Sequence, residues 1–232
     1  MMDNLTPYNP YEYTPTQLWC LGLSAINTEV NGERHDILQH ADPHTFQNSL
    51  RAWWDIHDRD SYLESIAWLK QEGHRMAFNE HWGITLVTPI TEWLQQEAEI
   101  KKRDAREHHR LAIVRHYRNQ LGSQGIAAWD LGRIVLLARM AFTAGYISEQ
   151  EAWDTLLEQG AQATRLFNSW YPFAHSYLIG RQYAMRNLDD RTGRNNLQAT
   201  HRLLTQPESP WLRYPDFENA FSTSAISTPV HH

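Results

Sequence analysis

The sequence predicts an all-α fold, a single compact helical domain of roughly seven to nine helices. Apolar residues recur at helical spacing along most of the chain, and no convincing run alternates apolar and polar residues as a half-buried strand does. A helix start signal, Thr or Asp followed by Pro, occurs three times, at Thr14-Pro15, Asp42-Pro43 and Thr88-Pro89. The best strand candidate, residues 84–87, is short and isolated.

The first half of the chain is expected to divide at these signals and at glycines. Residues 1–13, rich in Pro, Tyr and Asn, predict an extended arm. Helices start at Pro15 and Pro43, and an amphipathic helix after Ser61 stops at Gly73. Residues 90–121 predict one continuous helix whose middle is charged and solvated.

The second half contains the most apolar helix, over residues 126–144. Ser148 and Glu151 form a capping-box pattern at the start of the next helix. Another helix follows Trp170, and a short one is expected around residues 197–204. We expect a single domain over 14–216 and a flexible tail over 217–232, which has little apolar content.

Composition indicates a globular protein of the cytoplasm. The chain has 232 residues, 41% of them hydrophobic, and a net charge of −6, which is not the basic balance that nucleic-acid binding needs. The lone Cys20 cannot form an internal disulfide. No secretory signal or membrane-spanning segment is visible, so we expect no nucleic-acid partner and no membrane partner. Ten tryptophans predict deep helix packing or, as the alternative, an aromatic-lined groove.

Asp130 and Arg133 are the first candidate site residues. Three positions apart on a helix, they share a face and can pair. Their helix is otherwise almost wholly apolar, so at least part of that face is buried, and a buried charge needs a partner. The pair either fixes the packing of the helices or, with Trp129, lines a pocket; both alternatives stay open.

A second arginine is expected to join them. Gly132-Arg133 and Gly180-Arg181 each place a glycine inside a helix, which is unfavourable unless two backbones approach closely there. If these helices cross, Arg133 and Arg181 converge and require an anion, from Asp130, Asp55 or Glu151 or from a ligand phosphate or carboxylate.

Asp55, Arg59, His74 and Arg75 bracket one helix of about four turns. His74 is a candidate general acid or base. A His-Arg pair at a helix end also caps the last carbonyl groups, and this alternative is favoured.

Other chemistry has little sequence support. His40 and His44 have metal-ligand spacing without an obvious third ligand, so we expect no metal. No nucleotide-binding loop or nucleophile motif is present, and no cofactor is expected.

Several of these blocks together resemble a bacterial family, domain of unknown function 1266. They are Trp54-Asp55-Ile56-x-x-Arg59, Gly73-His74-Arg75, Ala128-Trp129-Asp130-Leu131-Gly132-Arg133, Glu151-Ala152-Trp153 and Tyr177-x-x-Gly180-Arg181. The resemblance covers roughly residues 18–211. It implies a shared fold and no established activity, so no catalytic residue is carried over from it.

Two functional hypotheses follow. In the first, the chain is a binding or interaction module that recognises a protein or a small anionic ligand. In the second, it is a hydrolase or transferase in which Arg133, Arg181, Arg59 and Arg75 with Trp129 bind an anionic substrate, while Asp130, Asp55 or His74 serves as acid or base. A cavity at the cluster would favour a site, whereas a satisfied, dry cluster would favour a structural role.

Overall fold

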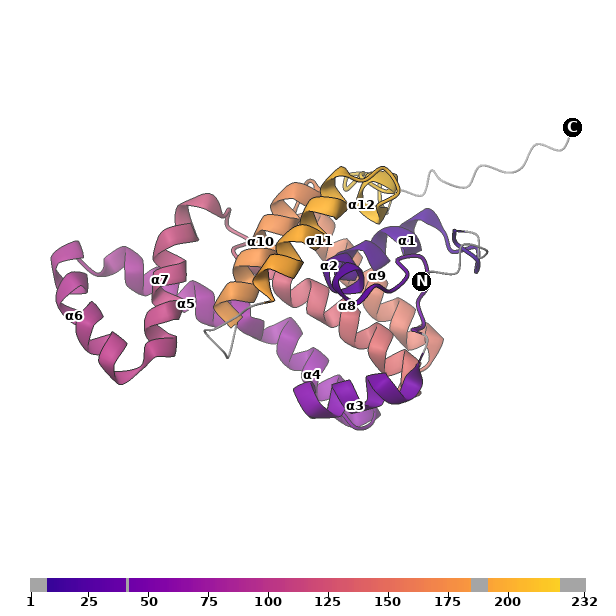
Figure 1. The fold of residues 1–232 in the computed structure, drawn as a ribbon, viewed down its shortest axis with the longest axis horizontal. Coiled ribbons are helices and arrows are strands. Elements are labelled where there is room, and N and C mark those ends of the chain that lie inside the picture. Colours follow the sequence, from indigo (N-terminus) through magenta and orange to yellow (C-terminus); the bar gives the residue numbers. More distant parts are fainter. Residues whose placement is uncertain (1–7, 41, 185–191, 222–232) are drawn as a thin grey trace, which may run out of the picture.

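The computed structural model describes residues 8–40, 42–184 and 192–221 of the chain (Figure 1). These residues form helices and contain no strand, which confirms the all-α prediction. The long helices within the described ranges are α3 (Pro43–Trp54), α4 (Arg59–Gln71), α5 (Gly73–Val87), α6 (Ile90–Arg103), α7 (Ala105–Tyr117), α8 (Ala127–Thr143), α9 (Glu149–Leu166), α10 (Trp170–Ala184) and α11 (Gly193–Thr205). The short ones are α1 (Pro15–Leu21), α2 (Ala25–Asn31) and α12 (Pro210–Arg213).

The helix starts occur close to where the sequence places them. Thr14 forms a capping box with Gln17 at the start of α1, and Asp42 caps α3. Ser148 and Glu151 form the expected capping box at the start of α9. The third signal starts α6 at Ile90, the predicted first residue, with Pro89 as the N-cap residue.

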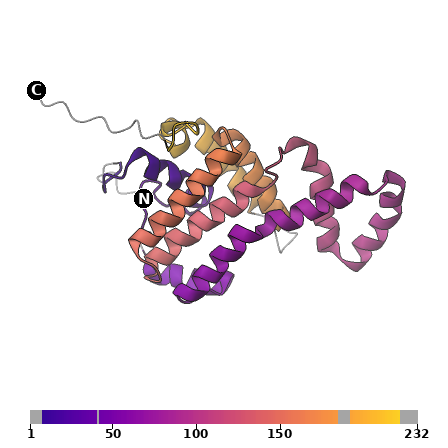
Figure 2. The same ribbon diagram turned by 180° about the vertical axis from the view of Figure 1, so that it is seen from behind.

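Helix α8 lies at the centre of the core and is buried along nearly its whole length. It packs against α9 and α10, and it also contacts α3, α4, α5 and the 3-10 turn Gly22–Ser24 (Figures 1 and 2). This burial explains the continuous apolar pattern of residues 126–144. Most tryptophans serve packing: Trp170 stacks on Trp211 with centroids 5.2 Å apart, whereas Trp53 is 75% exposed.

The charged segment projects from this core. Helix α5 extends away from α8, and α6 and α7 fold back as a hairpin at its far end (Figures 1 and 2). The prediction of one continuous helix over 90–121 is wrong, because the chain turns at Asp104. The Asp104 carboxylate accepts the backbone N–H groups of Arg106 and Glu107 and thereby starts α7 as a new helix. The strand candidate 84–87 belongs to α5.

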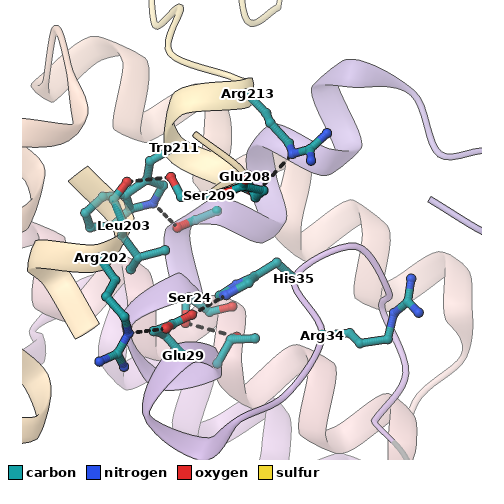
Figure 3. Close-up of polar contacts among 12 residues, drawn as sticks. Ser24, Glu29, Arg34, His35, Arg202, Leu203, Glu208, Ser209, Trp211 and Arg213 are labelled. Carbon is teal, nitrogen blue, oxygen red and sulfur yellow. Dashed lines mark hydrogen bonds and ion pairs between the residues drawn. The ribbon is translucent and has the colours of Figure 1, made fainter. Parts of the chain in front are cut away.

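The C-terminal helices return to the N-terminal ones. Glu29 of α2 accepts Arg202 Nε of α11 and lies 2.9 Å from His35 Nε2 (Figure 3). Two hydrogen bonds lower the pKa of Glu29 to about 2. The bond with His35 has the larger effect and the bond with Arg202 the smaller one. Trp211 Nε1 donates to the Gly22 carbonyl at 2.8 Å (Figure 3).

The expected domain limits are only partly within the described ranges. Residues 1–7 of the expected arm and 222–232 of the expected tail lie outside them. The core reaches beyond the expected limit at 216, because Phe217 is buried with its ring 4.8 Å from those of Trp19 and Trp170.

Candidate functional site

The candidate site is built around a corner between α4 and α5. Gly73 forms the corner with a φ of +56°, a conformation that disfavours any residue with a side chain. A Cβ atom at this position would lie 2.3 Å from Asp130 Oδ2. Two reasons therefore require glycine at position 73. It allows the turn, and it lets the carboxylate of α8 approach the start of α5.

Asp130 accepts four hydrogen bonds from this corner. Its Oδ1 receives the backbone N–H of His74 at 3.1 Å and faces His74 Nδ1 at 3.3 Å. Its Oδ2 receives the backbone N–H of Arg75 at 3.1 Å and Arg75 Nη1 at 3.3 Å. The Asp130 side chain is 2% exposed. An arginine and the positive end of α5 thus compensate its buried charge.

Arg75 also closes the other side of the corner. Its Nη1 donates to the Leu69 carbonyl at 2.6 Å, and its Nη2 donates to the Lys70 carbonyl. These are the last carbonyl groups of α4, so the predicted capping role is confirmed for Arg75. His74 does not cap them; its ring packs edge-on against Trp68 and Trp129.

Arg133 does not form the ion pair with Asp130 that the sequence spacing suggests. Its guanidinium carbon lies 4.5 Å from the ring centroid of Trp54 and 5.0 Å from that of Trp129. Asp130 is bound instead by the corner, which supplies two backbone donors along with a cation. Burial lowers the pKa of Arg133, and the charge of Arg181 acts in the same direction.

The close approach predicted for the two glycines is present. A Cβ atom on Gly180 would lie 2.4 Å from Trp129 Cβ, and one on Gly132 would lie 2.9 Å from both the Leu23 carbonyl oxygen and the Tyr177 ring. Burial raises the pKa of Tyr177 to about 12, and both Arg133 and Arg181 oppose this shift. The two arginines therefore act on the same buried phenol. Arg181 also donates to Thr192 Oγ1.

Two other candidates lie elsewhere. Asp55 ends α3 in a left-handed conformation with a φ of +57° and is exposed. Arg59 forms an ion pair with Glu151, in which Arg59 Nη2 lies 2.8 Å from Glu151 Oε1. This pair links the start of α4 to the start of α9. The structure thus brings together Asp130, His74 and Arg75, sets Trp129, Arg133 and Arg181 beside them, and leaves Asp55 and Arg59 outside.

Arg139 is a buried cation whose role the sequence does not reveal. It is 0% exposed, and burial lowers its pKa to about 10. Its Nη1 donates to Ser24 Oγ and Thr28 Oγ1 at 2.9 and 2.7 Å, and its Nη2 donates to the Ile37 carbonyl at 3.0 Å. The Leu38 and Arg34 carbonyls accept Nε and Nη2 as well. All of these acceptors are neutral and belong to the N-terminal segment, so Arg139 anchors that segment to α8.

Neither a metal cluster nor a membrane span is found within the described ranges. No group of three or more His, Cys, Asp or Glu side chains there has the arrangement of a metal site. None of the helices in that part of the chain has the length and apolar character needed to cross a membrane.

Comparison with known proteins identifies the family. Residues 49–215 match the family described as "Protein of unknown function (DUF1266)", and the chain belongs to it. This confirms the resemblance seen in the sequence. The matched range includes the Gly73 corner, the central helix α8 and both arginines near Tyr177.

Two curated relatives come from Escherichia coli strain K12. "Uncharacterized protein YbeR" is 30% identical over 144 residues, which cover 61% of this chain and 59% of that protein. "Uncharacterized protein YbeU" is 25% identical over 134 residues, which cover 58% of this chain and 56% of that protein. The match thus spans less than two thirds of either relative. No solved structure matches the chain.

Proposed function

We propose that this protein is a helical binding module that recognises an oxyanion, a carboxylate or phosphate group of its partner, through Arg133. The observation that carries the proposal is a guanidinium that lies over the rings of Trp54 and Trp129 and has no hydrogen-bond acceptor among the described residues. Its Nε is buried, whereas its two terminal nitrogens keep contact with solvent.

The chemistry of this side chain favours an anion. A guanidinium offers five N–H donors in a rigid plane that matches carboxylate and phosphate oxygens. The guanidinium carbon lies over both tryptophan rings, and a cation–π contact of this kind uses none of the N–H donors. Arg181 adds a second positive charge nearby, as its effect on Arg133 indicates.

The alternative of a hydrolase or transferase gains no support from the geometry. Its candidate acids or bases are Asp130, Asp55 and His74. Asp55 lies apart at the end of α3, and the His74 ring faces Asp130. The oxygens of Asp130 already accept four donors, and the residue is 1% exposed. A catalytic carboxylate must reach a proton of the substrate. Asp130 instead joins α5 to α8.

A location in the cytoplasm is part of this proposal. The one cysteine of the chain, Cys20, is buried, and burial raises the pKa of the thiol, which keeps it in the unreactive protonated form. A single thiol of this kind suits a reducing compartment. Fractionation of cells with an antibody against the chain tests the location.

Titration with inorganic phosphate and with acetate tests the oxyanion site. We expect the Arg133 Nε–H signal in 15N-labelled protein to shift on titration, and Arg133→Gln to weaken binding by about tenfold or more, the usual loss for a charge-assisted hydrogen bond. Arg51→Gln, which removes an exposed arginine of α3, is the matched control. Equal binding by wild type and Arg133→Gln, or no binding by wild type, would refute the proposal.

A further inference from the structure

A separate cavity borders the Asp130 corner. Its volume is about 470 Å³. It is bordered by helices α4, α5, α8 and α9 and by residues 123–124. Cavities of this size hold small molecules in other proteins. Arg75 and Asp130 form part of its wall, whereas Arg133, Trp129 and Arg181 do not line it. It is therefore distinct from the oxyanion site proposed above.

One wall of the cavity is apolar. Ala127, Leu131 and Ile134 follow one another along a single face of α8, at helical spacing. Leu69 of α4 and Leu166 of α9 extend this surface. A ligand in the cavity can therefore bury a hydrocarbon group there.

The charges around the cavity leave one cation uncompensated. Lys70 pairs with Glu158, and Arg75 pairs with Asp130. Arg165, in the last turn of α9, also lines the cavity but forms no ion pair with any described residue. A ligand with one negative group complements this balance.

Gln159 supplies the most specific signal. It is only 4% exposed, it lines the cavity, and its side-chain amide has no hydrogen-bond partner among the described residues. Its oxygen and nitrogen are not among the buried polar atoms that lack a partner, so they keep contact with solvent and a ligand in the cavity can reach them. The amide carries one acceptor oxygen and two N–H donors, so its complement is a group that both donates and accepts, such as another amide.

We infer that this cavity binds a small carboxylic acid that also carries an amide and an apolar side group. The carboxylate pairs with Arg165, the amide exchanges hydrogen bonds with Gln159, and the apolar group lies against Leu131 and Ile134. An N-acylated amino acid and the C-terminal residue of a peptide share this chemistry.

The test uses the full chain and N-acetyl-leucine as probe, with binding followed by calorimetry and by the side-chain NH2 signals of Gln159. We expect binding that shifts these signals. N-acetyl-leucinamide, which lacks the carboxylate, binds about tenfold more weakly or worse, as do Arg165→Gln and Gln159→Leu. Gln150→Leu on the exposed start of α9 and Arg51→Gln on α3 are the matched controls and bind as wild type does.

A peptide arm distinguishes the two sources of the ligand. If an acetylated tetraalanyl-leucine binds more tightly than N-acetyl-leucine, the ligand is a peptide end; if it binds more weakly, the ligand is a free small acid. Gln159→Leu should keep its melting temperature because it removes an unpartnered amide, and Arg165 is exposed, so loss of binding does not reflect unfolding. The inference is overturned if no probe binds wild type, or if both variants bind as well as wild type. Arg133→Gln should leave this binding unchanged, which separates it from the oxyanion site.

Discussion

The backbone N–H of His74 donates to Asp130 Oδ1 at 3.1 Å, across 56 positions of sequence. The carboxylate that caps α5 therefore comes from α8 and not from the residue that precedes the helix. Glu72, which occupies the N-cap position, makes no side-chain capping hydrogen bond. The start of the projecting helix thus depends on tertiary packing, and Asp130 is the residue that provides it.

Replacing Asp130 by alanine should lower the free energy of unfolding by about 3–5 kcal/mol, the range for breaking a buried ion pair. The change leaves the His74 and Arg75 amides without their acceptor and the Arg75 guanidinium without its ion-pair partner. Urea denaturation measures the loss. Asp130→Asn keeps the shape but places an NH2 group against donors, and should cost about 2 kcal/mol. If Asp130→Asn were as stable as wild type, the carboxylate would not be structural.

Gly73→Ala should be more destabilising than Gly32→Ala, although both glycines have positive φ values, +56° and +68°. The left-handed conformation alone costs alanine about 1–2 kcal/mol at each position. No atom lies within 4 Å of a Cβ at Gly32, whereas a Cβ at Gly73 meets Asp130 Oδ2 at 2.3 Å. We expect an additional loss of about 2 kcal/mol for Gly73→Ala, as for other overpacked sites. Equal losses in the two variants would show that the carboxylate can move away without cost.

Much of the fold was predictable because its signals are local. Caps such as Thr14 and Ser148 act within one turn of their helix, so sequence spacing is sufficient to find them. The break at Asp104 was missed for the converse reason. A charged, solvated stretch is compatible with one helix or two, and the capping role of Asp104 depends on a turn that apolar periodicity does not report.

The candidate site was predicted in part. A charge on an apolar helix correctly marked Asp130 as buried and in need of partners. Its actual partners, His74 and Arg75, could not be separated from Arg133 by sequence, because only tertiary structure decides which donors reach a carboxylate. Gln159 gave no signal, since a glutamine in an amphipathic helix looks the same whether its face is solvated or lines a cavity.

Two helical glycines should respond in opposite directions to alanine. Gly180 packs against Trp129, where a Cβ would lie 2.4 Å from the Trp129 Cβ, so Gly180→Ala forces α8 and α10 apart and should cost about 1–3 kcal/mol. Gly83 lies on the exposed side of α5, and a Cβ atom there would meet no other atom within 4 Å. Gly83→Ala should stabilise the protein by about 0.5–1 kcal/mol, through helix propensity and a less flexible unfolded chain. Melting temperatures of the two variants should move to opposite sides of the wild-type value. A gain in Gly180→Ala would show that the helices do not approach closely there.

His40 should make the protein less stable in mild acid. It is 4% exposed, its ring stacks on that of Phe46 with centroids 4.3 Å apart, and its Nδ1 lies 2.9 Å from Glu33 Oε2. Burial lowers the pKa of His40, as does the charge of Arg139, while Glu33 acts in the opposite direction. The unfolded chain protonates this histidine at about pH 6.5. Below that pH the unfolded state binds more protons than the folded state, so stability present above it is lost as the pH falls toward the folded-state pKa.

The measurement compares the free energy of unfolding, from urea denaturation, at about pH 7.5 and pH 5.5. These values lie on either side of the pKa of a histidine in the unfolded chain. Wild type should lose more stability between these values than His40→Gln, which cannot titrate. His201→Gln removes an exposed histidine of α11 and should keep the wild-type dependence on pH. The loss of stability on acidification is compared between the two variants. Their difference gives the contribution of the buried His40 imidazole apart from that of the other histidines. If His40→Gln kept the full wild-type loss on acidification, protonation of His40 would not be what weakens the fold.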